Sequence, residues 1–150
     1  METRLRILAP QLSVVLFQLP PQFVRDTERL GKFLDMLPRK RRYAFEFRHP
    51  SWYDDTVFNL LRRKSVSLCV SDHADAPSPW IATADHIYIR GHGPRGNYSG
   101  SYTSSTLRRW VEHIRIWRTQ GHDIFAYFDN DQKGAAPKDA QRLNRMLADL

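Results

Sequence analysis

The sequence predicts an α/β fold in which about five parallel strands alternate with helices. Apolar, β-branched runs recur along the chain, segments with apolar residues at helical spacing separate them, and Pro or Gly stops several of the runs. Strands that alternate with helices pair in parallel, because each helical crossover returns the chain to the same end of the sheet. At 150 residues the chain is long enough for one core, so we expect residues 1–150 to form a single domain.

Three strands and two helices are expected in the first half of the chain. The strands are 13–20, 42–49 and 66–72, and the helices are 27–38 and 52–64. Pro20 and Pro21 stop the first strand, and Asp26 can cap the helix that follows. After Pro50, Ser51 is expected to open the second helix.

Two strands and two helices are expected in the second half. The strands lie near 87–90 and over 123–131, and the helices over 106–121 and 137–150. The third helix carries one apolar stripe, formed by Leu107, Trp110, Val111, Ile114 and Trp117. Gly121 fits a carboxyl-terminal cap of that helix.

The composition limits the classes of function. The net charge of +7 permits binding to phosphate groups or nucleic acid, although solvated helix faces explain many of the cations. The lone Cys69 excludes a disulfide within the chain and a thiolate metal cluster. We find no signal peptide and no apolar run of about 20 residues that could span a membrane. A cytoplasmic protein with no membrane partner is therefore expected.

The period of two in the second strand divides its side chains between two faces. The aromatic face is expected to pack on helices and consists of Tyr43, Phe45 and Phe47. The other face, with Ala44, Glu46 and Arg48, is expected to look into the sheet or barrel interior. The same rule groups Tyr88, Arg90 and His92 in the fourth strand, and Phe125, Tyr127 and Asp129 in the fifth.

Polar residues follow the strands, and ligand sites of parallel α/β folds lie at the carboxyl ends of strands. Three residues are candidate catalytic acids or bases: Glu46, His92 and Asp129. The candidate substrate-binding residues are Gln18, Arg48, His49, Asp72, Arg90, Tyr98, Tyr127 and Asn130. The alternative is a purely structural network, because interior charges of this kind must compensate one another.

Two further features leave alternatives open. Side chains of the types that bind divalent metals occur at the strand ends: His49, Asp72, His92 and Asp129. No close-spaced ligand motif supports a metal site, so no metal site is assigned. The glycine-rich loop 93–102 follows a strand and matches no phosphate-binding motif. It fits either a tyrosine-bearing lid or a plain surface loop.

Five segments resemble, in order, the signature segments of the DUF72 family, also called YecE-like. They are VLFQLPPQF, FEFRHPSW, IYIRGHG, YSGSY and YFDND. The resemblance implies a TIM-like (β/α) barrel with a polar cleft at the carboxyl strand ends, and a biochemical function that is not established. Gly91 departs from the family, which has a larger apolar residue there, and a loosening of local packing is expected.

The resemblance also implies an amino-terminal segment that has no counterpart in this sequence. We therefore expect a partial barrel of about five strands, truncated on its amino-terminal side, with open outer edges. The chain is a fragment, or it completes a barrel by self-association or with a complementing amino-terminal segment, or it folds as an open sheet.

These observations favour a barrel that binds or acts on a phosphate-bearing or otherwise anionic small molecule. The sequence assigns no cofactor and leaves open whether the protein is an enzyme. One alternative is a non-catalytic nucleic-acid-binding protein that uses basic residues 39–42 together with Arg108, Arg109, Arg115 and Arg118. The other is an inactive fragment that needs strands from another chain.

Overall fold

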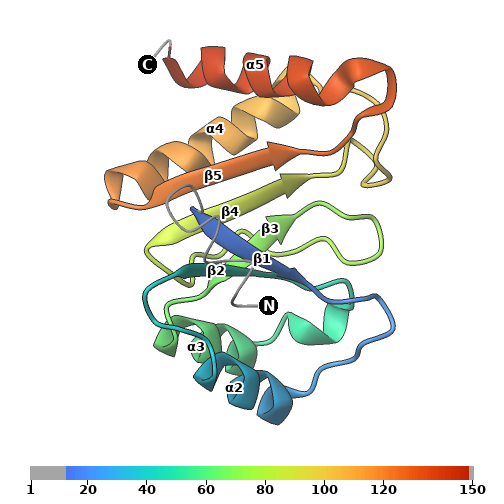
Figure 1. The fold of residues 1–150 in the computed structure, drawn as a ribbon. Helices are drawn as coiled ribbons and strands as arrows, with labels where there is room; N and C mark the ends of the chain where they lie inside the picture. The colour runs from blue at the N-terminus through green and yellow to red at the C-terminus, as the bar shows by residue number, and fades with distance from the viewer. Residues whose placement is uncertain (1–12, 149–150) are drawn as a thin grey trace.

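Five parallel strands form one sheet in which each strand pairs with the next along the chain. The computed structural model describes residues 13–148. The strands are β1 (Val14–Gln18), β2 (Arg42–Glu46), β3 (Ser67–Ser71), β4 (His86–Gly91) and β5 (Asp123–Phe128). The helices are α2 (Thr27–Asp35), α3 (Asp55–Arg63), α4 (Ser104–Thr119) and α5 (Ala135–Ala148). The predicted α/β class and the five parallel strands are confirmed (Figure 1).

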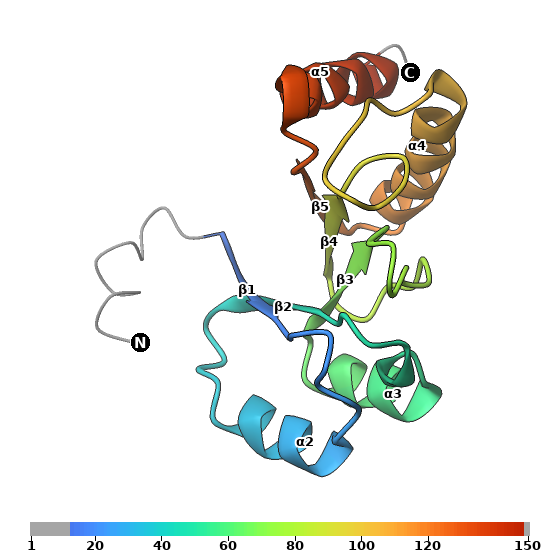
Figure 2. The ribbon, with the colours of Figure 1, turned by 90° about the vertical axis from the view of Figure 1, so that its right-hand side faces the viewer.

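The sheet curls into a half-barrel, as seen along its edge in Figure 2. Helices α2 and α3 cover the β1–β3 end, and α4 and α5 cover the β4–β5 end. The curl brings concave-face side chains of distant strands together: Arg42 of β2 pairs with Asp123 of β5 at 2.7 Å. The fold is thus a partial TIM-like barrel.

The predicted start of the second helix is wrong. Residues Pro50–Trp52 form a separate 3₁₀-helix, η1, and α3 begins only at Asp55, with Asp54 as its N-cap. The physical reason is local, since the side chain of His49 accepts the N–H of Ser51 and fixes the short turn. The Asp54 carboxylate then accepts the N–H of Thr56 at 2.9 Å.

Other element ends differ by a few residues from the predicted ones, as helix and strand ends commonly do. Helix α2 stops at Asp35, and α5 begins at Ala135 after a 3₁₀-turn over Gln132–Gly134. Gly121 follows α4 with a φ of +87°, the left-handed conformation that the predicted cap requires.

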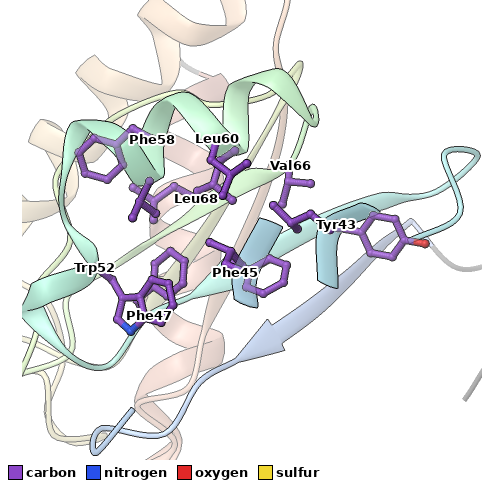
Figure 3. Packing of buried hydrophobic residues seen from close by; sticks show 12 residues of the cluster. Tyr43, Phe45, Phe47, Trp52, Phe58, Leu60, Val66 and Leu68 are labelled. Atoms are coloured by element: carbon purple, nitrogen blue, oxygen red, sulfur yellow. The ribbon is translucent and has the colours of Figure 1, made fainter. Parts of the chain in front are cut away.

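The first of two cores lies between the β1–β3 end of the sheet and helices α2 and α3. Tyr43, Phe45 and Phe47 all point to this side, which confirms the predicted aromatic face (Figure 3). Trp52 of η1 stacks on Phe47 with ring centroids 4.7 Å apart, and its indole nitrogen donates to the carbonyl of Phe23 at 2.6 Å. The side chains of the other face of β2, Ala44 and Glu46, are thereby directed to the concave face of the sheet.

The second core joins β4 and β5 to α4 and α5. Ile87 and Ile89 pack on the predicted stripe of α4, whose five residues are all buried. At Gly91 an added Cβ would lie 2.8 Å from Trp110, 2.8 Å from the Tyr102 hydroxyl and 2.9 Å from Phe128. The expectation that Gly91 loosens the packing is therefore wrong, because these aromatic residues fill the space.

Two strand edges lack a strand partner within residues 13–148: the outer edge of β1 and the outer edge of β5. On the concave face, Tyr127 of β5 is 49% exposed, and Leu16 of β1 and Phe125 of β5 are only half-buried. In the described part of the chain, every helix is too short or too polar to cross a membrane.

Candidate functional site

Glu46 is the centre of the polar network at the carboxyl ends of the strands. It ends β2 on the concave side and is fully buried. Its Oε1 accepts a hydrogen bond from Nε of Arg48 at 2.7 Å and lies 3.0 Å from Nε2 of His92. Its Oε2 accepts Nη1 of Arg90 at 2.6 Å. One carboxylate therefore links β2 to the end of β4.

The same contacts explain the acidity of Glu46. Burial alone would raise its pKa, but hydrogen bonds from His92 and Arg90 and the charges of Arg90 and Arg48 outweigh burial and lower the pKa from 4.5 to about 2. Glu46 is therefore a charged group at neutral pH, and it holds both guanidinium groups in place.

Arg48 and Arg90 converge from β2 and β4. The side-chain oxygen of Gln18, at the end of β1, accepts Nη2 of Arg48 at 3.1 Å and Nη1 of Arg90 at 2.9 Å. Nη1 of Arg48 also donates to the hydroxyl of Tyr98 at 2.6 Å, and Nη2 of Arg90 donates to Asp129 after β5. Side chains from the ends of four strands and one loop thus meet in one network.

His92 is fully buried between two carboxylates. Its Nε2 faces Glu46, and its Nδ1 lies 2.8 Å from Oδ1 of Asp129. These last two atoms are buried but lack the geometry of a hydrogen bond to any described residue. Both ring nitrogens can donate only when the ring is protonated, so this pair is a place where a proton can be held or exchanged.

Asp72 fixes the backbone that carries His92. Its Oδ1 accepts the N–H of His92 at 2.7 Å, and its Oδ2 accepts the hydroxyl of Tyr102. Burial raises the pKa of Asp72, although both hydrogen bonds oppose the rise. The Tyr102 hydroxyl also accepts the N–H of Gly93 at 2.7 Å, and burial with the nearby Asp72 charge raises the pKa of Tyr102.

The loop 93–102 is held in a defined shape over the network. Gly93, Gly96, Tyr98 and Gly100 all have positive φ values. At Gly96 an added Cβ would lie 2.3 Å from the carbonyl oxygen of Asp72, so only glycine fits there. The ring of Tyr98 lies 5.0 Å from the ring of His92, and this placement over the network fits the lid better than the plain surface loop.

Three predicted site residues lie outside the network. His49 is engaged locally, with Nδ1 2.8 Å from the hydroxyl of Ser51. Tyr127 stacks on Tyr88 with centroids 5.1 Å apart, on the exposed part of the concave face. Asn130 is fully buried, and its Nδ2 donates to the carbonyl of Gly100 at 2.6 Å, so it anchors the loop.

Sequence reasoning missed Asp139 of α5. It is fully buried and accepts from Ser101 at 2.7 Å, from the N–H of Tyr102 at 3.0 Å and from Asn130 at 2.9 Å. Because α5 shows an ordinary amphipathic pattern, nothing in its sequence separates this buried carboxylate from an exposed one. The only signal was indirect, since a loop rich in glycine and serine needs an anchor to keep one shape.

No group of three His, Cys, Asp or Glu side chains within residues 13–148 is arranged to hold a metal ion. The carboxylate oxygens of Glu46 instead accept hydrogen bonds from guanidinium groups, which would compete with a cation for these oxygens. The arrangement is suited to binding anions and to proton transfer.

Comparisons with known proteins agree with this architecture. The DUF72 family model, described as a protein of unknown function, matches residues 1–150. No curated protein matches the chain.

Crystal structures show the same fold. A DUF72 family protein from Thermotoga maritima MSB8 is 26% identical with a TM-score of 0.87, and the match covers 98% of this chain and 64% of that one. Two structures of a DUF72 family protein from Enterococcus faecalis V583 have TM-scores of 0.78 and 0.75 at 18% and 19% identity. Those two matches cover 96% of this chain and 63% and 66% of the others, so this chain spans less than two thirds of each. With a family match over its whole length, the chain belongs to the DUF72 (YecE-like) family, whose function is unknown.

Proposed function

We propose that the network around Glu46 binds a small phosphate-bearing or otherwise anionic molecule. The observation that supports it is the convergence of Arg48 and Arg90 at the carboxyl ends of β2 and β4, with Glu46 and Gln18 holding both. Guanidinium groups positioned in this way bind oxyanions through paired N–H donors.

The arginines keep donors for a ligand. A guanidinium has five N–H donors, and each of the two makes three hydrogen bonds to described residues. Arg90 is 19% exposed at its side chain, whereas Arg48 is 6% exposed and lies beneath Tyr98. An anion would therefore reach Arg90 first and would contact Arg48 after a movement of Tyr98.

Glu46 and the His92–Asp129 pair have different proposed roles. A carboxylate with a pKa of about 2 is a weak general base at neutral pH, so Glu46 acts by positioning the arginines. Asp129 is 23% exposed at its side chain and lies 2.8 Å from the buried His92, so this pair is our candidate for proton transfer. Asp72 and Asn130 would support the site through the backbone and the loop.

The experiment measures binding of inorganic phosphate to the purified chain by calorimetry. Arg90→Gln should weaken binding by about tenfold or more, because it removes a charge-assisted contact. Arg145→Gln, at an exposed position of α5, removes the same charge far from the network and should change the affinity less than about twofold.

Folding must be followed in parallel by urea denaturation. Arg90→Lys keeps a positive charge beside Glu46 but loses the paired N–H donors of the guanidinium group. This variant should therefore stay folded and bind phosphate more weakly than the unaltered chain. If Arg90→Gln and Arg90→Lys both fold and bind phosphate as the unaltered chain does, the proposal is wrong. If both unfold, the network is structural.

A second proposal concerns completeness of the site. We propose that strands from another copy, or from a complementing amino-terminal segment, cover the concave face. The support is the half-exposed Tyr127, the unpaired edges of β1 and β5 within residues 13–148, and the greater length of the DUF72 structures. Such strands would add residues to the same carboxyl ends that carry the network.

We also propose that the protein acts in the cytoplasm. The support is Cys69, a free thiol that is buried and whose pKa burial raises, as expected for a structural cysteine in a reducing compartment.

A further inference from the structure

A basic cavity lies at the opposite end of the sheet from the Glu46 network. Its volume is about 490 Å³, and its walls are the end of α2, the loop to β2, the end of α3 and the turn to β3. These segments connect helices to the amino ends of β2 and β3 (Figure 1). The cationic lining residues are Arg39, Lys40, Arg41, Arg42, Arg63 and Lys64.

Two acidic side chains, Asp35 and Asp85, belong to the lining, so its six cations leave an excess of four positive charges. Asp35 pairs with Lys64, and Oδ1 of Asp85 lies 2.8 Å from Nδ1 of His86. Arg42 is paired with Asp123. Four cations of the lining, however, have no acidic partner within residues 13–148: Arg39, Lys40, Arg41 and Arg63. A concave wall with this excess of positive charge concentrates an attractive potential for anions.

Compensation of helix dipoles does not account for all of these charges. Arg63 lies in the last turn of α3, where a cation is stabilising. Arg39, Lys40 and Arg41 instead lie beyond the end of α2, in the loop. Three neighbouring like charges in a loop repel one another and add to the positive potential of the cavity.

Hydrogen bonds to backbone carbonyl groups fix the loops that form the walls of the cavity. The carbonyl of Pro38 accepts the hydroxyl of Tyr43 at 3.1 Å, which ties the α2–β2 loop to the sheet. Two backbone hydrogen bonds close the α3–β3 turn. The N–H of Ser65 donates to the carbonyl of Arg62 at 3.1 Å, and the N–H of Val66 donates to the carbonyl of Leu61 at 3.0 Å. A site with a fixed backbone loses less entropy when a ligand binds.

We propose that this cavity binds a compact anion with two or more phosphate groups. Four unpaired cations exceed what one phosphate needs, and the volume lies in the range of small-molecule sites. The site uses no residue of the Glu46 network and is independent of the function proposed for it.

The test is calorimetric titration of the full chain with tripolyphosphate. The double variant Arg41→Ser with Arg63→Ser should lose about tenfold or more in affinity. The control, Arg108→Ser with Arg109→Ser, removes the same charge from two exposed positions of α4 and should lose less than about threefold. All of these titrations are made in the Arg90→Gln background, which weakens the Glu46 network, so that binding at the cavity is measured separately.

Other outcomes overturn the proposal. An equal loss in both double variants would show that net charge alone binds the probe. In the Arg90→Gln background, orthophosphate binding as tightly as tripolyphosphate would exclude recognition of two phosphate groups at the cavity. Binding of a short single-stranded oligonucleotide without binding of tripolyphosphate would indicate an extended nucleic-acid surface instead. If the first double variant unfolds, Arg39→Ser with Lys40→Ser, both at exposed positions, must give the same loss.

Discussion

Glu46 is the residue on which the most charges depend, because Arg48, Arg90 and His92 all face its carboxylate. Glu46→Gln should lower the free energy of unfolding by about 3–5 kcal/mol, since it leaves two guanidinium groups without their buried counter-ion. Urea denaturation measures the change. Glu28→Gln is the control: its pair with Lys32 is exposed, so the loss there should be below about 0.5 kcal/mol. Equal losses would contradict the central role of Glu46.

The low pKa of Glu46 predicts a pH dependence of stability. The folded state holds the proton less tightly than the unfolded chain, so the contribution is present above the unfolded pKa of 4.5 and is lost as the pH falls toward 2. A shift of this size corresponds to about 3 kcal/mol. Urea denaturation at several pH values should show this loss in the unaltered chain and not in Glu46→Gln. Parallel pH curves for the two proteins would rule out the shift.

The hydroxyl of Tyr102 should contribute to stability in addition to the packing of its ring. Tyr102→Phe leaves Oδ2 of Asp72 and the N–H of Gly93 without a hydrogen-bond partner, and should cost about 2 kcal/mol. Tyr127→Phe removes a hydroxyl that bonds to no described residue and should be nearly neutral in thermal denaturation. If both variants melt alike, the Tyr102 contacts contribute little.

At the scale of elements, two glycines make a matched pair. Gly91→Ala places a methyl group against Trp110, Tyr102 and Phe128, and overpacking there should cost about 1–3 kcal/mol. Gly31→Ala in α2 meets only a side-chain atom of Leu60 at 3.9 Å and should stabilise the protein by about 0.5–1 kcal/mol. Opposite changes in urea midpoint are expected, and a stabilising Gly91→Ala would refute the packing described for β4 and α4.

The sequence predicted elements best where a regular pattern repeats. Alternation placed Phe45 toward the helices and Glu46 toward the interior, and helical spacing identified the stripe of α4. The sequence could not predict that His49 caps a 3₁₀-turn and that α3 begins only at Asp55. The reason is that Ser51 and Asp54 are equally good N-cap residues.

The site was predictable as a set of strand-end residues but not as a network. Pairs such as Gln18 with Arg90, or Glu46 with His92, join strands that are not neighbours in the sheet. They depend on the curl of the whole sheet, which no local pattern records. Asn130 was assigned to the site because it follows the fifth strand. Its hydrogen-bond partners, however, belong to the loop 93–102 and to α5.

For the whole molecule, the two open edges predict association. Sedimentation velocity at increasing concentration should show self-association of the chain, since an unpaired apolar strand edge can pair with another copy. Val14→Lys, in the edge strand β1, should reduce it, because a lysine on a strand edge opposes pairing. Val24→Lys replaces an exposed valine outside any strand and should have no effect. A chain that stays monomeric at all concentrations would contradict this prediction.

The order of the strands has a consequence for how the protein is made. Every ladder joins consecutive strands, from Val14 beside Arg42 to His86 beside Asp123, so within residues 13–148 no pairing connects β1 with β5. Chains with sequence-local pairing close short loops and fold faster than chains with distant pairing. Each strand with its helix can therefore dock on the part already synthesised, and the half-barrel can grow from β1 to β5 while the polypeptide is still leaving the ribosome.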